Sequence, residues 1–401
     1  MANKKEIEKL EDLIKGTIDG ELVEQQVSSL LPPGENYGSV MYKVDFKVKT
    51  SSGEIKEYHA VAKCTPLNQV TQEMFNTQVT FKSEIAWYTT VIPTLKSFAK
   101  EQGLRRELDF FQQFYGARIS LDPESDKVDL DGVILTENLK YLGFKNIDRH
   151  QGFDEPTTIS ILNDLAAFHA VPMAIRALNP NLFNDKVKPY CPKFGMSKEM
   201  GQDFLKSILD VFNYIPHLDA FRQRIDKNFN ESCPFERTEI REPWVTSTHL
   251  DFWTNNIMTN GLKNVILDLQ MPAVGSPAGD LIFFLLTSVN FDLIQTKIDE
   301  FTEIYYRLLI GNLIDLKVDT QKYSFESFLK EINLEMKYTE FAHSLAHCHM
   351  ILLEKGHSGL DSADANYKPE DFQLQETTKP NGEQIRKFTW ITEEALKRNW
   401  I

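Results

Sequence analysis

Residues 249–256 read HLDFWTNN, and residues 266–270 read ILDLQ. In the first stretch Asp251 precedes Asn256 by five positions, and in the second an apolar run ends on Asp268. Between the two stretches an Asn-Gly pair separates two short apolar arms, a pattern typical of a β-hairpin. We expect this hairpin to place Asn256 opposite Asp268, with Asp251 on the loop before it.

These three side chains suit phosphoryl transfer. Mg²⁺ takes few protein ligands and prefers oxygen, so the amide of Asn256 and the carboxylate of Asp268 are predicted to bind Mg²⁺. Asp251 would orient an attacking hydroxyl and accept its proton. An Asp or Asn in a tight turn more often caps its own backbone, so other parts of the chain must support this interpretation.

A second group of residues lies near the N-terminus. VMYKVDFKVK, residues 40–49, alternates apolar and polar side chains and predicts a half-buried strand that returns as EYHAVAKC. This hairpin brings Lys63 opposite Met41, next to the glycine-containing loop at residues 32–39. Such a loop lets backbone N–H groups approach phosphates, and Lys63 adds positive charge. Glu84, on the helix that follows, is the expected partner of Lys63.

The order of the predicted elements divides the chain into two parts. Strand patterns with one intervening helix predict a small mixed sheet in the first part. Long helical patterns prevail later, and only residues 244–270 interrupt them with short strand signals. We therefore expect a bilobal α+β chain with a β-rich lobe over residues 1–137 and a larger, mostly helical lobe over residues 138–401. The second lobe would contain a helical insertion near residues 171–245.

Composition restricts the partners and the compartment. The 58 acidic and 44 basic residues give a formal charge of −14, which argues against a nucleic-acid partner. Neither a signal peptide nor an apolar stretch of about 18 residues is evident, so we expect no membrane association. The four cysteines are scattered, as in reduced cytosolic proteins. We expect a cytoplasmic protein with no obligate protein partner.

Taken together, the motifs resemble the ecdysteroid-kinase-like (CHK kinase-like) family. Its members are small-molecule kinases that are distantly similar to choline kinases and aminoglycoside phosphotransferases. The shared residues occur in the family's order from about residue 34 to residue 288. They are GENYGS (34–39), Ala62-Lys63, Glu84 within FKSEIAWY, LAAFHA (165–170), HLDFWTNN, ILDLQ and SPAGDLIFFL (276–285).

The resemblance implies a protein-kinase-like fold that binds ATP and Mg²⁺ between its lobes. Lys63 would hold the α- and β-phosphates, and Glu84 would hold Lys63. The glycine-containing loop would cover the phosphates. The resemblance assigns this role to Gly34, Asn36 and Ser39.

The same resemblance assigns the remaining site residues. LTENL, residues 135–139, would be the hinge, in which Glu137 and Leu139 offer backbone groups to adenine. Asp251 would be the catalytic base. Asp280 resembles a buried Asp that braces the catalytic loop, so its role would be structural.

The expected acceptor is a small, hydrophobic alcohol such as an ecdysteroid. Only eleven residues separate Asp268 from Asp280. This leaves no room for the long activation segment with which protein kinases dock a peptide. Apolar residues of the helical insertion would suit a steroid, but they suit a helix core better. These residues are Phe204, Ile208, Val211, Phe212 and Tyr214.

Two alternatives remain open. Leu250 stands where the family usually has Gly, Leu269 where it has Phe, and Asn138 where it has Asp. These departures favour a catalytically silent member that binds a hydrophobic ligand or a partner. They remove no required charge, however, and at Leu250 we expect a local backbone adjustment. The second alternative is a kinase for a polar choline- or aminoglycoside-like acceptor, which calls for an acidic pocket.

Four histidines invite functional interpretations. His343 and His347 in HSLAHCHM share a helical face and could bind zinc. No Glu follows His343 as a metalloprotease helix requires, so ordinary helix packing is favoured. His169, on an apolar helix, is interpreted as a hydrogen-bonded core histidine. His249 is expected to stabilise its loop through hydrogen bonds.

Overall fold

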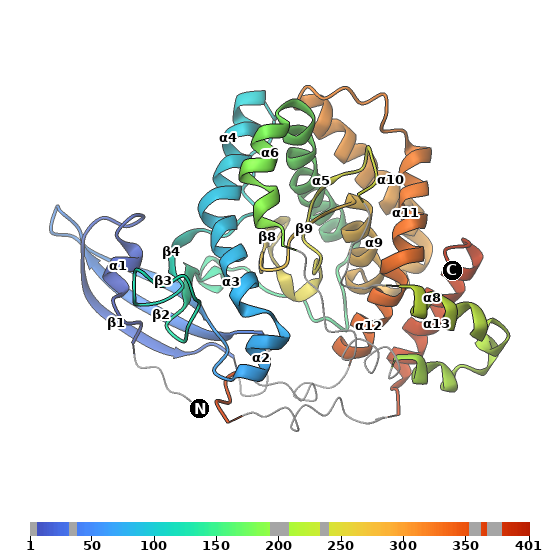
Figure 1. The fold of residues 1–401 in the computed structure, drawn as a ribbon, viewed down its shortest axis with the longest axis horizontal. Coiled ribbons are helices and arrows are strands. Elements are labelled where there is room, and N and C mark those ends of the chain that lie inside the picture. The colour runs from blue at the N-terminus through green and yellow to red at the C-terminus, as the bar shows by residue number, and fades with distance from the viewer. Residues whose placement is uncertain (1–5, 32–37, 193–207, 233–239, 353–361, 367–378) are drawn as a thin grey trace. The chain divides into compact units, whose positions relative to one another are not determined.

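The computed structural model describes residues 6–31, 38–192, 208–232, 240–352, 362–366 and 379–401 (Figure 1). The chain divides into two compact units, which draw on segments from both sides of the expected boundary after residue 137. Unit 1 comprises Met1–Tyr88, Phe111–Lys145 and Glu354–Gln375. Unit 2 comprises Thr89–Phe110, Asn146–Leu353 and Glu376–Ile401.

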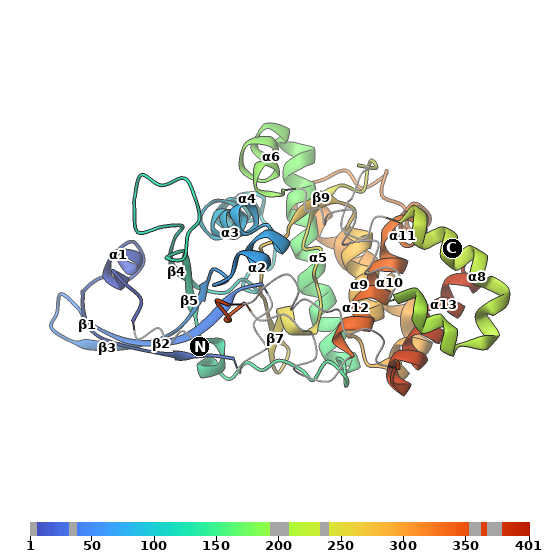
Figure 2. The same ribbon diagram turned by 60° about the horizontal axis from the view of Figure 1, so that its bottom comes forward.

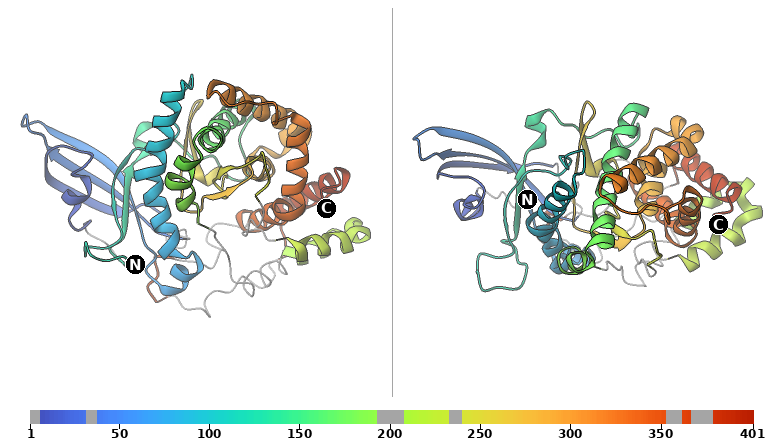
Figure 3. Two further views of the ribbon diagram at one scale, coloured as in Figure 1. Left: turned by 45° about the horizontal axis from the view of Figure 1, so that its top comes forward. Right: turned by 90° about the horizontal axis from the view of Figure 1, so that it is seen from above.

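Unit 1 contains a five-stranded sheet in the order β1-β2-β3-β5-β4. Figure 3 shows the blue strands of this sheet from two further sides. Every neighbouring pair is antiparallel, so the expectation of a mixed sheet is wrong. The reason is that β5 enters the sheet between β3 and β4 and runs against both. The strands are β1 Glu21–Ser29, β2 Val40–Lys49, β3 Ile55–Cys64, β4 Phe114–Arg118 and β5 Val133–Glu137.

The alternation predicted for residues 40–49 is confirmed in β2. Its five alternate apolar side chains, from Val40 to Val48, are buried in the core of unit 1. No comparable alternation marks β1, and we did not predict this strand. None of the nine residues of β1 is fully buried, which suits a polar strand at the edge of a sheet.

Among the described residues, three α-helices lie wholly within unit 1. They are α1 Leu10–Ile14, α2 Gln69–Met74 and α3 Thr77–Ala86. The single helix expected from about residue 73 to residue 91 is interrupted at Asn76, whose φ of 46° is left-handed. After α3 the chain continues through a π-helical turn, Trp87–Val91, into α4, Ile92–Gln102. Glu84 therefore lies on α3, which begins at Thr77.

Unit 2 is mostly helical, with two small antiparallel sheets. Figure 2 shows α9, α11 and α12 packed together. One sheet pairs β6 Thr246–Thr248 with β9 Ala273–Gly275, and the other pairs β7 Ile257–Asn260 with β8 Lys263–Ile266. The main helices are α5 Glu155–Leu178, α6 Pro180–Lys186, α8 Arg222–Glu231, α9 Pro277–Ser288, α10 Phe291–Asp315, α11 Phe325–Glu335, α12 Phe341–Ile351 and α13 Gly382–Lys397.

Helix α5 corrects one expectation. By length and composition it is apolar enough to cross a membrane, whereas we expected no such stretch. However, 83% of its most apolar window is buried within the structure. A core helix has this property, and α5 packs against α6, α10 and β6.

Some of the apolar residues of the expected helical insertion near residues 171–245 follow the core interpretation. Ile208, Val211 and Phe212 are buried, as the core interpretation predicts. Tyr214 is exposed. Phe204 lies outside the described residues.

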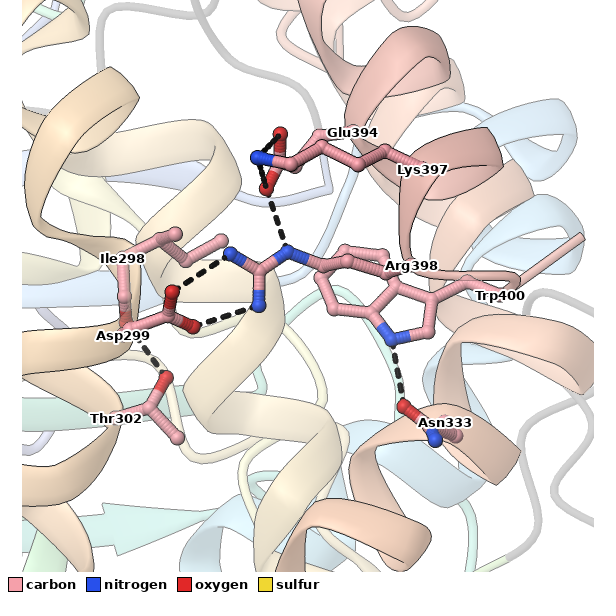
Figure 4. A network of polar contacts seen from close by, with 8 residues as sticks. All are labelled: Ile298, Asp299, Thr302, Asn333, Glu394, Lys397, Arg398 and Trp400. Carbon is pink, nitrogen blue, oxygen red and sulfur yellow. Dashed lines mark hydrogen bonds and ion pairs between the residues drawn. The ribbon is translucent and has the colours of Figure 1, made fainter.

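The end of the chain is fixed to unit 2 by a polar network (Figure 4). Arg398, just after α13, donates to both carboxylate oxygens of Asp299 on α10, at 2.6 and 3.0 Å. Its Nε also donates to Glu394 at 2.6 Å. The indole N–H of Trp400 donates to Asn333 of α11 at 2.7 Å. These bonds join α13 to α10 and α11.

Helix α13 begins at Gly382, earlier than the expected start near residue 391, and Asn381 forms a capping box at its N-terminus.

We expect Asp299→Asn to lower stability in a pH-dependent way. Hydrogen bonding to Arg398 holds the pKa of Asp299 below its ordinary value of 3.8. The charged form therefore stabilises the fold above that value, and the contribution is lost as pH falls through the lowered pKa. Because the carboxylate is mostly exposed, the loss at pH 7 should be about 1 kcal/mol or less. Thermal denaturation at several pH values measures it.

Glu303→Gln is the matched control, because the partner of Glu303, Arg307, lies on the same helix. This change should have little effect at any pH. A deficit of Asp299→Asn that stayed constant down to pH 3 would contradict the charge-based explanation.

Candidate active site

Lys63 and Glu84 form the ion pair expected in unit 1. Lys63 on β3 lies opposite Met41 on β2, as predicted. Its Nζ donates to Oε2 of Glu84 on α3 at 2.5 Å. The two side chains are only 12% and 4% exposed. Removing either partner would leave a poorly solvated charge, so the pair holds the ammonium group in one place.

The predicted hinge has backbone groups that suit adenine. Gln112 donates through Nε2 to the carbonyl of Glu137 at 2.7 Å, and this carbonyl keeps a second lone pair. Leu139 is the first residue of a short 3₁₀ helix, Leu139–Leu142, where backbone N–H groups lack an intrahelical partner. Asn138 caps this helix by accepting from the N–H of Lys140 at 3.2 Å.

Of the glycine-containing loop, the structure describes only the end. Gly34 and Asn36 lie outside the described residues. Ser39 lies just before β2, and its hydroxyl contacts the sulfur of Met41 at 3.5 Å. A Cβ at Gly38 would come within 2.9 Å of the Phe75 ring, so a larger residue there would displace that ring.

The hairpin in unit 2 has a register one residue away from the expected one. Ile257 pairs with Ile266, and the N–H of Leu267 donates to the carbonyl of Asn256 at 2.8 Å. Asn256 therefore lies opposite Leu267, and Asp268 is the next residue. The shift arises because Gly261, with a φ of 61°, closes a two-residue turn between the strands.

Asn256 and Asp251 form one hydrogen-bonded unit. Nδ2 of Asn256 donates to the backbone carbonyl of Asp251 at 2.8 Å and to its Oδ2 at 2.8 Å. Both partners are acceptors, which settles the orientation of the amide. Oδ1 of Asn256 therefore points away from Asp251 and remains a possible metal ligand.

Asp268 completes an acidic pair with Asp251. Burial and, next in size, the negative charge of Asp268 raise the pKa of Asp251. The two carboxylates are thus close enough to repel each other. Asp268 has a left-handed φ of 62° and accepts from Gln270 Nε2 at 3.3 Å. Two carboxylates beside an amide oxygen are a donor set that fits Mg²⁺.

Asp280 braces the loop that carries Asp251. It lies in the first turn of α9, where its side chain is 1% exposed. Oδ2 accepts from the backbone N–H of His249 at 2.6 Å, and Oδ1 accepts from that of Leu250 at 3.0 Å. The structural role implied by the family resemblance agrees with these two bonds.

A buried histidine and tyrosine extend this brace. His169 on α5 contacts Oδ2 of Asp280 through Nε2 at 3.0 Å and the hydroxyl of Tyr305 on α10 through Nδ1 at 2.6 Å. A carboxylate only accepts, so Nε2 donates and Nδ1 accepts from the tyrosine. His169 is the hydrogen-bonded core histidine that we expected. We missed Tyr305, because nothing in its helical pattern separates it from other core residues.

Two further loop residues have roles that the structure makes clear. His249 contacts the carbonyl of Leu267 through Nε2 at 2.8 Å and accepts from the N–H of Asp251 at 3.3 Å, so it stabilises the loop. Leu250 adopts a φ of 68°. Instead of the expected backbone adjustment, the leucine takes the left-handed conformation that suits Gly, at a cost of about 1–2 kcal/mol. The bonds to Asp280 offset this cost.

The zinc alternative has no geometric support in the described ranges. Within them, no group of three or more His, Cys, Asp or Glu side chains could hold a metal ion. His343 and His347 are buried in helix packing instead.

The described side chains are of the kinds that phosphoryl transfer requires: two carboxylates, an amide and a lysine paired with a glutamate. The model of the ecdysteroid kinase-like family matches residues 33–318. The chain belongs to this family of small-molecule kinases. No curated protein matches it significantly in sequence.

Similar solved structures include two kinases of known substrate class. An ethanolamine kinase from Plasmodium vivax is 10% identical, with a TM-score of 0.41, and the match covers 94% of this chain and 84% of that one. A choline kinase from Cryptosporidium parvum is 8% identical, with a TM-score of 0.45 and coverage of 94% and 91%.

Asp280→Asn should destabilise unit 2. The amide cannot accept from both backbone N–H groups of the loop and from His169, and hydrogen bonds to a charged group contribute about 1.5–3 kcal/mol each. We expect a loss of at least about 3 kcal/mol in the free energy of unfolding, measured by denaturant titration. Asp292→Asn, in the first turn of α10 and highly exposed, is the control. Equal effects of the two changes would refute the brace.

Proposed function

We propose that the protein is an ATP- and Mg²⁺-dependent kinase that transfers the γ-phosphoryl group to a hydroxyl of a small, hydrophobic alcohol such as an ecdysteroid. The observation that carries this proposal is the pair of bonds from Asn256 to Asp251. They join the candidate base to a candidate metal ligand. Membership of the ecdysteroid kinase-like family supports the same reaction class.

Asp251 is the proposed catalytic base. Its Oδ2 accepts from Asn256, which orients the carboxylate and leaves Oδ1 for the acceptor hydroxyl. In the reaction the acceptor oxygen bonds to the γ-phosphorus, the bond to the β-phosphate oxygen breaks, and the hydroxyl proton passes to Asp251. ADP is the leaving group. Catalysis would come from positioning and charge rather than from a covalent intermediate.

Asn256, through Oδ1, and Asp268 would hold Mg²⁺. The bound ion would neutralise phosphate charge. The mutual repulsion of Asp251 and Asp268 supports this assignment, because a cation beside two carboxylates relieves it.

Residues of unit 1 would bind the nucleotide. Lys63, held by Glu84, supplies a cation for the α- and β-phosphates. The carbonyl of Glu137 and the N–H of Leu139 would bond to adenine. Gly34, Asn36 and Ser39 are proposed to cover the phosphates with backbone N–H groups.

Small molecules are better acceptors for this site than peptides. The fully described segment from Asp268 to Pro277, where α9 begins, contains only the three-residue strand β9. That segment offers no platform for a peptide. We further propose a cytoplasmic protein without nucleic-acid, membrane or obligate protein partners, in line with its net charge of −14.

Asp251→Asn should reduce turnover by about 10²–10⁴-fold, because a general base of this kind contributes that much. ATP affinity should stay nearly unchanged, since the base acts on the acceptor. The assay is ADP formation with Mg²⁺ across ecdysteroids, simple sterols, choline and an aminoglycoside. Asp185→Asn, an exposed change on α6, is the control and should match the wild type.

The outcomes separate the alternatives. Turnover with choline or the aminoglycoside alone would replace the hydrophobic acceptor by a polar one. Mg·ATP binding without turnover of any compound would favour a catalytically silent protein. If Asp251→Asn retained wild-type turnover, Asp251 would not be the catalytic base.

Glu84→Gln should weaken ATP binding by about tenfold, because Lys63 loses the charge that positions it and a pair energy near 1.4 kcal/mol is tenfold in affinity. Asp268→Asn should abolish the Mg²⁺-dependent part of binding. Titration of nucleotide with and without Mg²⁺ measures both effects. The control is Glu73→Gln on α2, an exposed glutamate that contacts only Gln69 among the described side chains. Unchanged affinity in both site variants would contradict the nucleotide assignment.

A further inference from the structure

Helix α12 lies beside the catalytic loop. The ring of His343 stacks on Phe283 of α9 at a centroid distance of 4.2 Å, and its Nδ1 contacts Glu340 at 3.0 Å. The face of α12 that carries His343 therefore packs against α9, the helix whose Asp280 accepts from the loop just before Asp251.

His347 lies one turn further along this face and contacts Trp253 of the catalytic loop. The two rings meet edge to face at 4.4 Å, and His347 meets Phe283 in the same manner at 4.9 Å. Trp253 is two residues from Asp251 and half-buried. An aromatic surface thus lies on the loop that carries Asp251.

The imidazole of His347 has a hydrogen-bonding nitrogen that the described residues leave unused. The side chain is buried, at 5% exposure, and Nε2 has no hydrogen-bond partner among the residues that the structure describes. Buried polar atoms nearly always have partners, so an exception calls for a ligand or another explanation. A buried, neutral imidazole nitrogen can donate to or accept from a hydroxyl.

The surroundings of His347 keep its imidazole neutral. Burial, and then the positive charges of His343, Lys387 and Arg149, lower the pKa of His347 well below its ordinary value. These groups lie on α12, α13 and the segment before α5. The lowered pKa keeps the imidazole neutral, so Nε2 can bond to an uncharged hydroxyl.

We propose that Trp253 and His347 form the acceptor-recognition element of this kinase. Trp253 would pack against the apolar body of a polyhydroxylated alcohol, and Nε2 of His347 would bond to a hydroxyl other than the reacting one. This inference rests on the proposed function. Because Nε2 is buried and the Trp253 ring lies against the imidazole, the Trp253 side chain turns aside when the acceptor enters.

His347→Phe tests the hydrogen bond separately from the packing. Phenylalanine keeps an aromatic ring against Trp253 and Phe283 but lacks Nε2. With a polyhydroxylated ecdysteroid as probe, we expect the KM for the steroid to rise about tenfold while the KM for ATP stays unchanged. With a steroid that carries a single hydroxyl, the same variant should behave like the wild type.

His349→Phe is the matched control, since His349 lies on the same helix and contacts Phe388 of α13 rather than Trp253. It should leave both KM values unchanged. A second variant, His347→Gln, retains a hydrogen-bonding group and should keep more of the steroid affinity than His347→Phe. Thermal unfolding shows whether each variant folds.

Binding also gives a readout that does not depend on turnover. Titrating the ecdysteroid should change the tryptophan fluorescence of the wild type, and Trp253→Phe should remove that change. If the wild type phosphorylates the steroid but His347→Phe has an unchanged steroid KM, the proposed role of His347 in acceptor recognition is wrong. The proposed kinase activity is not affected by that result. If the wild type neither binds nor phosphorylates any alcohol, the proposed function and this inference both fail.

Discussion

The buried carboxylate of Asp280 is the constraint on which the candidate active site depends. It accepts from two consecutive backbone N–H groups, those of His249 and Leu250, just before Asp251. Peptide N–H groups must find acceptors when they are buried, and a charged acceptor holds them more strongly than a neutral one. Because α9 carries this carboxylate, the position of the helix sets the path of the loop. His169 and Tyr305 in turn connect the carboxylate to α5 and α10.

The hairpin after the loop brings residues that are separated in the sequence close together. Its strands turn at Gly261, so the residues at its open end, Asn256 and Asp268, return to the same region as Asp251. Below this end, the buried carboxylate of Asp164 on α5 accepts from Asn264 of β8 at 2.6 Å and also pairs with Arg106. The hairpin is thereby tied to the helical core at its middle and to the catalytic loop at its end.

Sequence patterns predicted the parts of the fold that follow a strong local rule. The alternation over residues 40–49 located β2, and its register with β3 placed Lys63 opposite Met41. The same reasoning missed the polar edge strand β1, because this strand has no buried face and therefore no alternating apolar pattern. It also misjudged the hairpin register by one residue, because the turn position depends on which residue adopts a positive φ. The roles of the site residues remain proposals, and Gly34 and Asn36 lie outside the described structure.

Several features in and around the loop that carries Asp251 work against the stability of the fold. Leu250 and Asp268 both have left-handed backbone conformations, and the carboxylates of Asp251 and Asp268 repel each other. On α12, His347 keeps a buried nitrogen that has no partner among the described residues. Unfavourable local conformations persist only where the surroundings impose them, and they gather at functional sites. Here Asp280 imposes the loop conformation. The electrostatic repulsion and the unpartnered nitrogen each define a ligand that would relieve them, a divalent cation and a hydroxyl group. These ligands are two of the three species that the proposed alcohol kinase would bind.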